Sequence, residues 1–139
     1  MYLLDTNVIS ELRRRKPHGG VLAWLAGVPD EDLRVSAVTI GELQAGIEAT
    51  RAQDAEKAAE LEAWAASVEQ SWNVLPMDSQ TFREWARLMH RRSDTLMEDA
   101  MIAATATVHG LTVVTRNVRD FRSFKVPVLN PFTIGRRPG

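Results

Sequence analysis

Short apolar segments alternate with stretches of helical periodicity along this chain, and that alternation limits the possible folds more than any other feature. The expected strands are residues 2–4, 33–38, 74–75, 111–114 and 126–129, and helices are expected after residue 7, over 21–28, from residue 39, and over 51–69, 81–92 and 95–109. Strands separated by helices usually pair in parallel, in a sheet covered on both faces. The sequence therefore predicts an α/β fold with a central parallel sheet of four to five strands.

The length and composition are those of one ordinary globular domain. The chain has 139 residues, 45% of them hydrophobic and 25% charged, and we expect a single domain over residues 1–139. No apolar run approaches the ~20 residues that span a membrane, and the first residues do not resemble a signal peptide, so a cytoplasmic location is expected. The absence of cysteine excludes disulfides, thiolate catalysis and Cys-type zinc sites.

Acidic residues stand where this fold would place a ligand. Asp99 interrupts a helix otherwise suited to burial, and an ionised carboxylate there is costly unless it is paired or bound to a metal. Asp5 and Asp120 follow two of the expected strands, and Glu42 lies in the helix after a third. Ligands of open α/β sheets bind beyond the carboxyl ends of the strands. Four converging carboxylates without Cys or suitably spaced His indicate a site for Mg²⁺ or Mn²⁺.

A purely structural explanation exists for Asp5, Glu42 and Asp120, but not for Asp99. Asp5 is a good N-cap for the helix that follows it. The segments Thr39–Glu42 and Thr95–Glu98 both fit the capping box, in which the fourth residue bonds back to the first. Asp120 could be a solvated loop acid or the cap of a short turn. A structural reading of all the acids must still explain Asp99 without a metal.

The basic residues are clustered although the formal net charge is only −1. The clusters are Arg13-Arg14-Arg15-Lys16, Arg91-Arg92, and Arg116 with Arg119 and Arg122. Such clusters are usually solvated faces, but those near Asp5 and Asp120 could also hold a nucleic-acid backbone, which gives affinity without sequence readout.

The motifs occur in the order found in one known family. The segments Leu3-Leu4-Asp5-Thr6-Asn7, Ser36-x-x-Thr39-Ile40-x-Glu42-Leu43, Asp99-Ala100-Met101-Ile102-Ala103-Ala104-Thr105-Ala106, Thr115-Arg116-Asn117-Val118-Arg119-Asp120-Phe121 and Leu129-Asn130-Pro131 resemble those of PIN-domain ribonucleases. The match is best to VapC-type toxins of bacterial type II toxin–antitoxin systems, including their FitB-like branch. This resemblance implies a three-layer α/β/α domain.

The resemblance also implies an activity and partners. It implies a metal-dependent endoribonuclease that uses Mg²⁺ or Mn²⁺ and cuts RNA, with tRNA among the candidate substrates. It also implies a VapB-type antitoxin as partner, homodimers and toxin–antitoxin hetero-oligomers. No interaction with a membrane is expected. A non-catalytic PIN-fold module that binds nucleic acid or a partner is the alternative. We expect the antitoxin to occupy an apolar groove formed by the helix of Val8 to Leu12 and by the helices that carry Trp24 and Trp64.

Carried over by position, the resemblance assigns roles to individual residues. The catalytic and metal-binding acids would be Asp5, Glu42, Asp99 and Asp120, supported by Thr115. As a hypothesis about the mechanism, we expect Thr6, Asn7 and Asn117 to orient these carboxylates too. The basic clusters near the site, rather than the resemblance, suggest that Arg13, Arg14, Arg116 and Arg119 contact the RNA backbone. Many PIN domains have Asp at the position of Asn117, so the sequence leaves open whether Asn117 or Asp120 completes the acidic site.

Overall fold

The computed structural model describes residues 1–134, and residues 135–139 of the predicted domain lie outside the described part. Its strands are β1 (Tyr2–Leu4), β2 (Leu33–Ser36), β3 (Asn73–Leu75), β4 (Thr112–Val114) and β5 (Val128–Leu129). Its helices are α1 (Thr6–Glu11), α2 (Gly19–Ala26), α3 (Ala37–Arg51), α4 (Ala55–Ser71), α5 (Ser79–Met89), α6 (Met97–His109) and α7 (Val118–Ser123). Short 3₁₀ helices are η1 (Asp30–Asp32), η2 (Asp94–Leu96) and η3 (Pro131–Thr133).

The strands form one sheet, and every pair in it is parallel, in the order β3-β2-β1-β4-β5. Leu4, the last residue of β1, lies between Val35 of β2 and Val114 of β4. The chain builds outward from β1 to β3 and then crosses back to place β4 on the other side of β1. The predicted α/β class and parallel sheet are confirmed, and the order of the strands reverses direction between β1 and β4.

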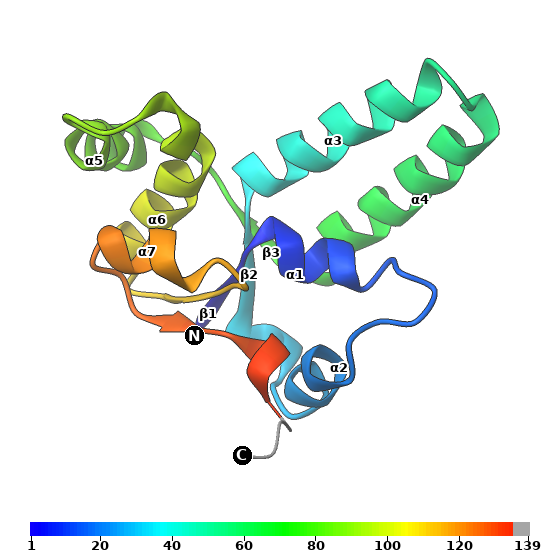
Figure 1. Cartoon of the computed structure of the whole chain (residues 1–139), viewed down its shortest axis with the longest axis horizontal. Coiled ribbons are helices and arrows are strands. Elements are labelled where there is room, and N and C mark those ends of the chain that lie inside the picture. Colours follow the sequence, from blue (N-terminus) through cyan, green and yellow to red (C-terminus); the bar gives the residue numbers. More distant parts are fainter. Residues whose placement is uncertain (135–139) are drawn as a thin grey trace.

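Helices cover both faces of the sheet, as Figure 1 shows. Successive side chains of a strand point to opposite faces. Leu3 accordingly belongs to a core cluster with buried residues of α6 and α7 and with α5 residues packed against it, whereas Leu4 belongs to a second cluster with residues of α1, α2 and α4. Helices α3 and α4 pair as a long hairpin that projects from the body (Figure 1). These layers are the α/β/α arrangement that the resemblance implied.

Both predicted capping boxes are wrong. Ser36 caps α3, since its hydroxyl accepts a hydrogen bond from the backbone N–H of Val38 at 3.1 Å. The predicted strand over 33–38 therefore ends earlier, because β2 runs into α3 without a loop and its last residue serves as the cap. Helix α6 begins at Met97, after η2, and its N-cap Leu96 makes no side-chain capping bond. Neither Glu42 nor Glu98 is thus explained as half of a capping box.

Other helix ends follow the sequence more closely. Asp78 caps α5 by accepting from the N–H of Thr81 at 2.9 Å. Gly110 ends α6 with a left-handed φ of 65°, which glycine adopts without strain. The helix predicted over 51–69 corresponds to α4, which begins only after its cap Asp54. Arg51 still belongs to α3. Among residues 1–134, no helix is long and apolar enough to cross a membrane.

Candidate active site

Asp5 lies directly after β1, where the strand order reverses and where open α/β sheets bind their ligands. Its side chain is almost fully buried, with 4% of the residue exposed. It accepts hydrogen bonds from the Thr6 N–H at 2.8 Å, from the Asn7 amide at 2.9 Å and from the Thr115 hydroxyl at 2.8 Å. Burial raises the pKa of Asp5, and these hydrogen bonds lower it in part. The carboxylate is therefore held in one orientation by neutral donors.

The hydroxyl of Thr115 ties the ends of β1 and β4 together. Besides donating to Asp5, it accepts from the Asn7 amide at 3.2 Å and from the N–H of Asn117 at 2.8 Å. The side-chain oxygen of Asn7 in turn accepts from the N–H of Arg116 at 3.2 Å. The two loops that follow adjacent strands are thus locked to each other around Asp5.

Glu42 reaches the same region from α3. The Thr6 hydroxyl donates to its Oε1 at 2.9 Å and also lies 2.9 Å from the hydroxyl of Thr39, which is fully buried. Partial burial raises the pKa of Glu42, with a smaller contribution from the negative charge of Asp5. In the sequence, Thr39 belongs to the second motif and to a possible capping box, but neither predicted a role for it in the site. The signal that points to it is its spacing of three residues from Glu42, which puts both on one side of a helix.

Asp99 and Asp120 are joined by Asn117. The amide nitrogen of Asn117 donates to Oδ2 of Asp99 and to Oδ2 of Asp120, at 2.9 Å in each case. Asp99 lies in the first turn of α6 and is half-buried rather than enclosed in the helix core. The amide of Asn117 thus links the two acids.

Hydrogen-bond partners link these acids: Thr6 contacts both Asp5 and Glu42, and Asn117, which joins Asp99 to Asp120, also donates to Thr115 beside Asp5. The pKa of Asp99 is raised to about 6, first by burial and then by the negative charges of Asp5, Asp120 and Glu42. None of the ion pairs of residues 1–134 includes any of these acids. The structure thus gathers carboxylates around one region without a protein cation to neutralise them.

The donors fit a hard divalent cation in kind, because they are all carboxylates. Their side chains, however, are not drawn into a tight cage: in the described part of the chain, no three His, Asp or Glu side chains lie close enough to hold an ion together. Mg²⁺ commonly keeps several waters and uses only one or two protein carboxylates together with substrate phosphates. An open arrangement of carboxylates is compatible with that mode.

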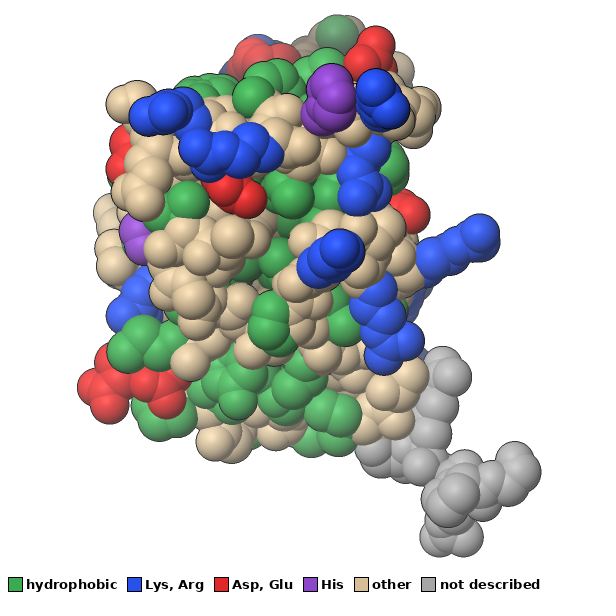
Figure 2. Space-filling model, turned by 90° about the vertical axis from the view of Figure 1, so that its left-hand side faces the viewer, with side chains coloured by type: hydrophobic (Ala, Val, Ile, Leu, Met, Phe, Trp, Pro, Cys, Tyr) green, Lys and Arg blue, Asp and Glu red, His purple; other side chains and the backbone are tan. Residues whose placement is uncertain are grey.

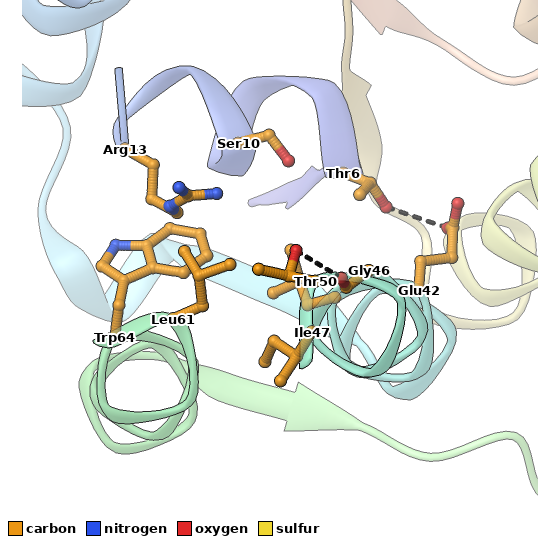
Figure 3. A pocket seen from close by; sticks show the side chains of 10 residues that line it. Thr6, Ser10, Arg13, Glu42, Gly46, Ile47, Thr50, Leu61 and Trp64 are labelled. Carbon is orange, nitrogen blue, oxygen red and sulfur yellow. Dashed lines mark hydrogen bonds between the residues drawn. The ribbon is translucent and has the colours of Figure 1, made fainter. Parts of the chain in front are cut away.

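A groove of about 340 Å³ begins beside this site and runs between α1, α3 and α4 (Figure 3). Thr6 and Glu42 lie at one end of it, and Leu61 and Trp64 at the other. The described residues that line it include none from α2. Trp24 instead packs edge-on against Tyr2, with ring centroids 5.0 Å apart. Of the three helices expected to form the antitoxin groove, the helix that carries Trp24 is therefore the one that does not line this groove.

The arginines predicted to hold RNA are all exposed, and three of them have protein neighbours. Arg13 lies 5.5 Å from the ring centre of Trp64, and Arg116 lies 3.8 Å from that of Phe132. Arg14 contacts Glu11 at 3.4 Å, and Arg119 is exposed beside Asp120 on α7. Stacking of this kind occupies a face of the guanidinium group but leaves donors free for phosphate.

Known proteins resemble this chain along almost its whole length. The sequence matches the PIN domain family over residues 2–126. A VapC ribonuclease of Sinorhizobium fredii is 36% identical, with 95% of this chain and 98% of the relative covered. Toxin FitB of Neisseria gonorrhoeae is also 36% identical, with coverage of 95% and 99%.

Solved structures also resemble this chain along almost its whole length. The crystal structure of FitAcB from Neisseria gonorrhoeae has a TM-score of 0.85 at 34% identity, covering 96% of this chain and 100% of the other. The structure of FitAB bound to a DNA fragment gives 0.83 at 33%, covering 99% and 100%. A match to the PIN domain over most of the chain, together with relatives of this similarity and length, identifies the family. The chain belongs to the PIN domain family, in the branch that contains the VapC and FitB toxins.

Proposed function

We propose that this protein is a divalent-metal-dependent endoribonuclease and the toxin of a VapBC-type toxin–antitoxin module. The observation that carries the proposal is the hydrogen-bond network that brings Asp5, Glu42, Asp99 and Asp120 together where the strand order reverses, with none of them in an ion pair of the described residues. The relatives named a VapC ribonuclease and a FitB toxin support the same activity for this chain.

In this proposal Asp5, Glu42, Asp99 and Asp120 hold Mg²⁺ or Mn²⁺. When bound, such an ion supplies a water of lowered pKa and neutralises the phosphate. The chain's own residues keep the carboxylates oriented: Thr115 and Asn7 fix Asp5, Thr6 fixes Glu42, and Asn117 fixes Asp99 with Asp120. The exposed Arg116 and Arg119 on the loop and first turn beside Asp120 are suited to bind the RNA backbone.

Cleavage of a pool of structured RNAs tests the activity. Antitoxin-free protein would be assayed with EDTA, with Mg²⁺ and with Mn²⁺, beside Asp99→Asn and the matched control Asp78→Asn. Asp78 is an exposed helix cap outside the site, so its variant should still cut. We expect metal-dependent cutting that only Asp99→Asn abolishes. No cutting by folded protein in either metal would instead favour a non-catalytic binding module.

We further propose that the groove beside Glu42 takes an apolar segment of a VapB-type antitoxin, and that homodimers assemble with antitoxin into a larger complex. The groove combines an apolar wall at Leu61 and Trp64 with Arg13 above the Trp64 ring (Figure 3). Solved structures with a similar fold include toxin–antitoxin complexes such as FitAB.

Trp64→Glu should weaken antitoxin binding by about tenfold or more, because a charge replaces a partly buried aromatic anchor in the groove. Trp24 packs against Tyr2 and does not line this groove, so a substitution of Trp24 would not test it. Calorimetric titration with the cognate antitoxin measures the change, and free ribonuclease activity should be kept. Unchanged affinity in folded Trp64→Glu would contradict this docking site.

A further inference from the structure

A second hollow lies at the other end of α7 from the acidic site. It has a volume of about 280 Å³ and is lined by Arg87, Leu88, His90, Arg92, Ser123, Phe124 and Lys125. We call it the α5–α7 pocket. Figure 2 views the side of the molecule that carries α5 to α7, where Lys and Arg side chains gather along the upper edge and down the right-hand side. No acidic residue is among the described residues that line the pocket.

Arg92 is fixed in place within this pocket. Its guanidinium donates to the backbone oxygen of Ser123 at 2.8 Å and to the Ser123 hydroxyl at 3.1 Å. The same group lies 4.6 Å from the ring centre of Phe124. A cation held by a carbonyl, a hydroxyl and an aromatic face keeps its charge, because none of these partners neutralises it. The pocket therefore has a rigid positive wall.

The two helices that end beside this pocket carry cations where glycine is usual. Arg91, which is next to the lining residues His90 and Arg92 but is not itself among them, follows α5 with a φ of 63°, and Lys125, which lines the pocket, follows α7 with a φ of 61°. Helix α6, which ends elsewhere, has Gly110 in the same conformation. A left-handed backbone is unfavourable for a residue with a side chain, and such strain tends to persist at functional sites. A cation at a helix C-terminus is favourable by itself. That effect does not explain why the C-termini of α5 and α7 meet at one cavity lined by further cations.

The charges of the pocket are largely unpaired. Of the pocket's cations, only Arg87 takes part in an ion pair among residues 1–134, with the half-buried Glu84 at 2.9 Å. Arg92 and Lys125 are in none of them. An anion is the chemical complement of such a site, and a phosphate suits the planar, multiple donors of arginine.

The pocket is rigidly connected to the acidic site. Helix α7 carries Asp120 in its first turn, and the hydroxyl of Ser123, at the pocket, donates to the backbone oxygen of Asp120. The six residues of α7 span only ~9 Å. We propose that the α5–α7 pocket binds a backbone phosphate of the substrate RNA, near the bond that is cut and on the same RNA strand. This inference rests on the proposed ribonuclease function.

The double variant Arg87→Gln/Lys125→Gly tests the pocket by RNA affinity alone. Binding of a fluorescein-labelled single-stranded RNA would be followed by anisotropy in EDTA, over a range of salt concentrations. Loss of the one phosphate contact should reduce the magnitude of the slope of log K against log salt by about 0.7. Glycine relieves the left-handed backbone at residue 125, so the melting temperature should not fall, which separates lost binding from lost folding.

A matched control removes the same charge elsewhere. Arg51→Gln/Lys57→Gln lies on the α3–α4 hairpin, away from the pocket, and should leave the slope nearly unchanged. Equal slopes in the pocket variant and the wild type, or an equal loss in the control, would overturn the proposal. Preference for double-stranded DNA over RNA of the same sequence would also overturn it.

The outcome stays distinct from that of the ribonuclease proposal. If the protein cuts RNA but the pocket variant binds RNA like the wild type, the pocket proposal fails while the activity stands. If the pocket variant loses RNA affinity but no cutting occurs in any metal, the activity fails and the pocket stands as an RNA contact. With both correct, the variant should raise KM and leave kcat nearly unchanged.

Discussion

At the scale of single residues, neutral hydroxyl and amide groups position the acids of this site. Thr39, Thr6 and Glu42 form one chain of hydrogen bonds, and Asn117 joins Asp99 to Asp120. Groups of this kind orient a carboxylate without neutralising it, so its charge stays available for a cation. Removing a residue that hydrogen-bonds to a metal ligand commonly lowers metal affinity or activity by roughly 10- to 100-fold.

Thr39→Val tests the first chain. The variant keeps the shape of the buried side chain but loses the hydroxyl beside Thr6, so Glu42 should be oriented less well. We expect ribonuclease activity to fall roughly tenfold at limiting metal and to recover partly at high metal concentration. Thr39→Ser retains the hydroxyl and should restore the metal dependence of the wild type. A loss of activity in both variants that no metal concentration relieves would point to packing instead.

Asn117→Asp tests the bridge between Asp99 and Asp120. The change removes the amide that donates to both acids and adds a third carboxylate, so the metal-free protein should lose at least about 1.5 kcal/mol of stability. An added divalent ion should recover more stability in this variant than in the wild type. Urea unfolding with EDTA and with Mn²⁺ measures both values. A smaller metal response than that of the wild type would show that Asn117 does not face the ion.

At the scale of elements, the junction between β2 and α3 matters most for the site. Ser36 ends the strand and caps the helix, and the first turns of that helix carry Thr39 and Glu42. Pairing of β2 with β1 places this junction beside Asp5. The position of Glu42 is therefore set by the strand register and by the cap together.

Ser36→Ala should cost about 1 kcal/mol of unfolding free energy, because the N–H of Val38 loses the acceptor that the fully buried Ser36 provides. Denaturant titration measures this change. Ser67→Ala is a suitable control, since its exposed hydroxyl only bonds back to the carbonyl of Trp64 within α4. Equal, negligible effects of both substitutions would contradict the role of Ser36 as the cap.

At the scale of the whole molecule, the acids come from segments spread over most of the chain and meet only because the sheet is folded. An ion that binds them in the folded state alone stabilises the fold as well as the site. At a free metal concentration ~100 times Kd, the gain is about 2.7 kcal/mol.

Thermal unfolding should show this coupling. Mn²⁺ is expected to raise the melting temperature of the wild type and of the Asp78→Asn control, but not that of Asp99→Asn. In EDTA, Asp99→Asn should be no less stable than the wild type, because it removes one of several mutually repelling charges. An equal rise with metal in Asp99→Asn would show that the ion binds elsewhere.

The sequence by itself determined the fold class. The strand segments ending at Leu4 and Val114 are short, apolar and separated by helices, which favours a buried parallel sheet whatever the order of its strands. It also placed Asp5 at a strand end by local pattern, and motif resemblance named the other acids. These features depend on neighbours in sequence, so local periodicity reveals them.

Only the tertiary structure decided which side chains meet. The contact of Thr6 with Thr39 spans 33 positions and that of Asn117 with Asp99 spans 18, so no local pattern specifies either. The burial of Trp24 against Tyr2, rather than in the groove with Trp64, likewise depends on how α2 packs on the sheet. Strand order and helix packing bring these pairs together through many weak contacts, and their sum is settled only when the whole chain is folded.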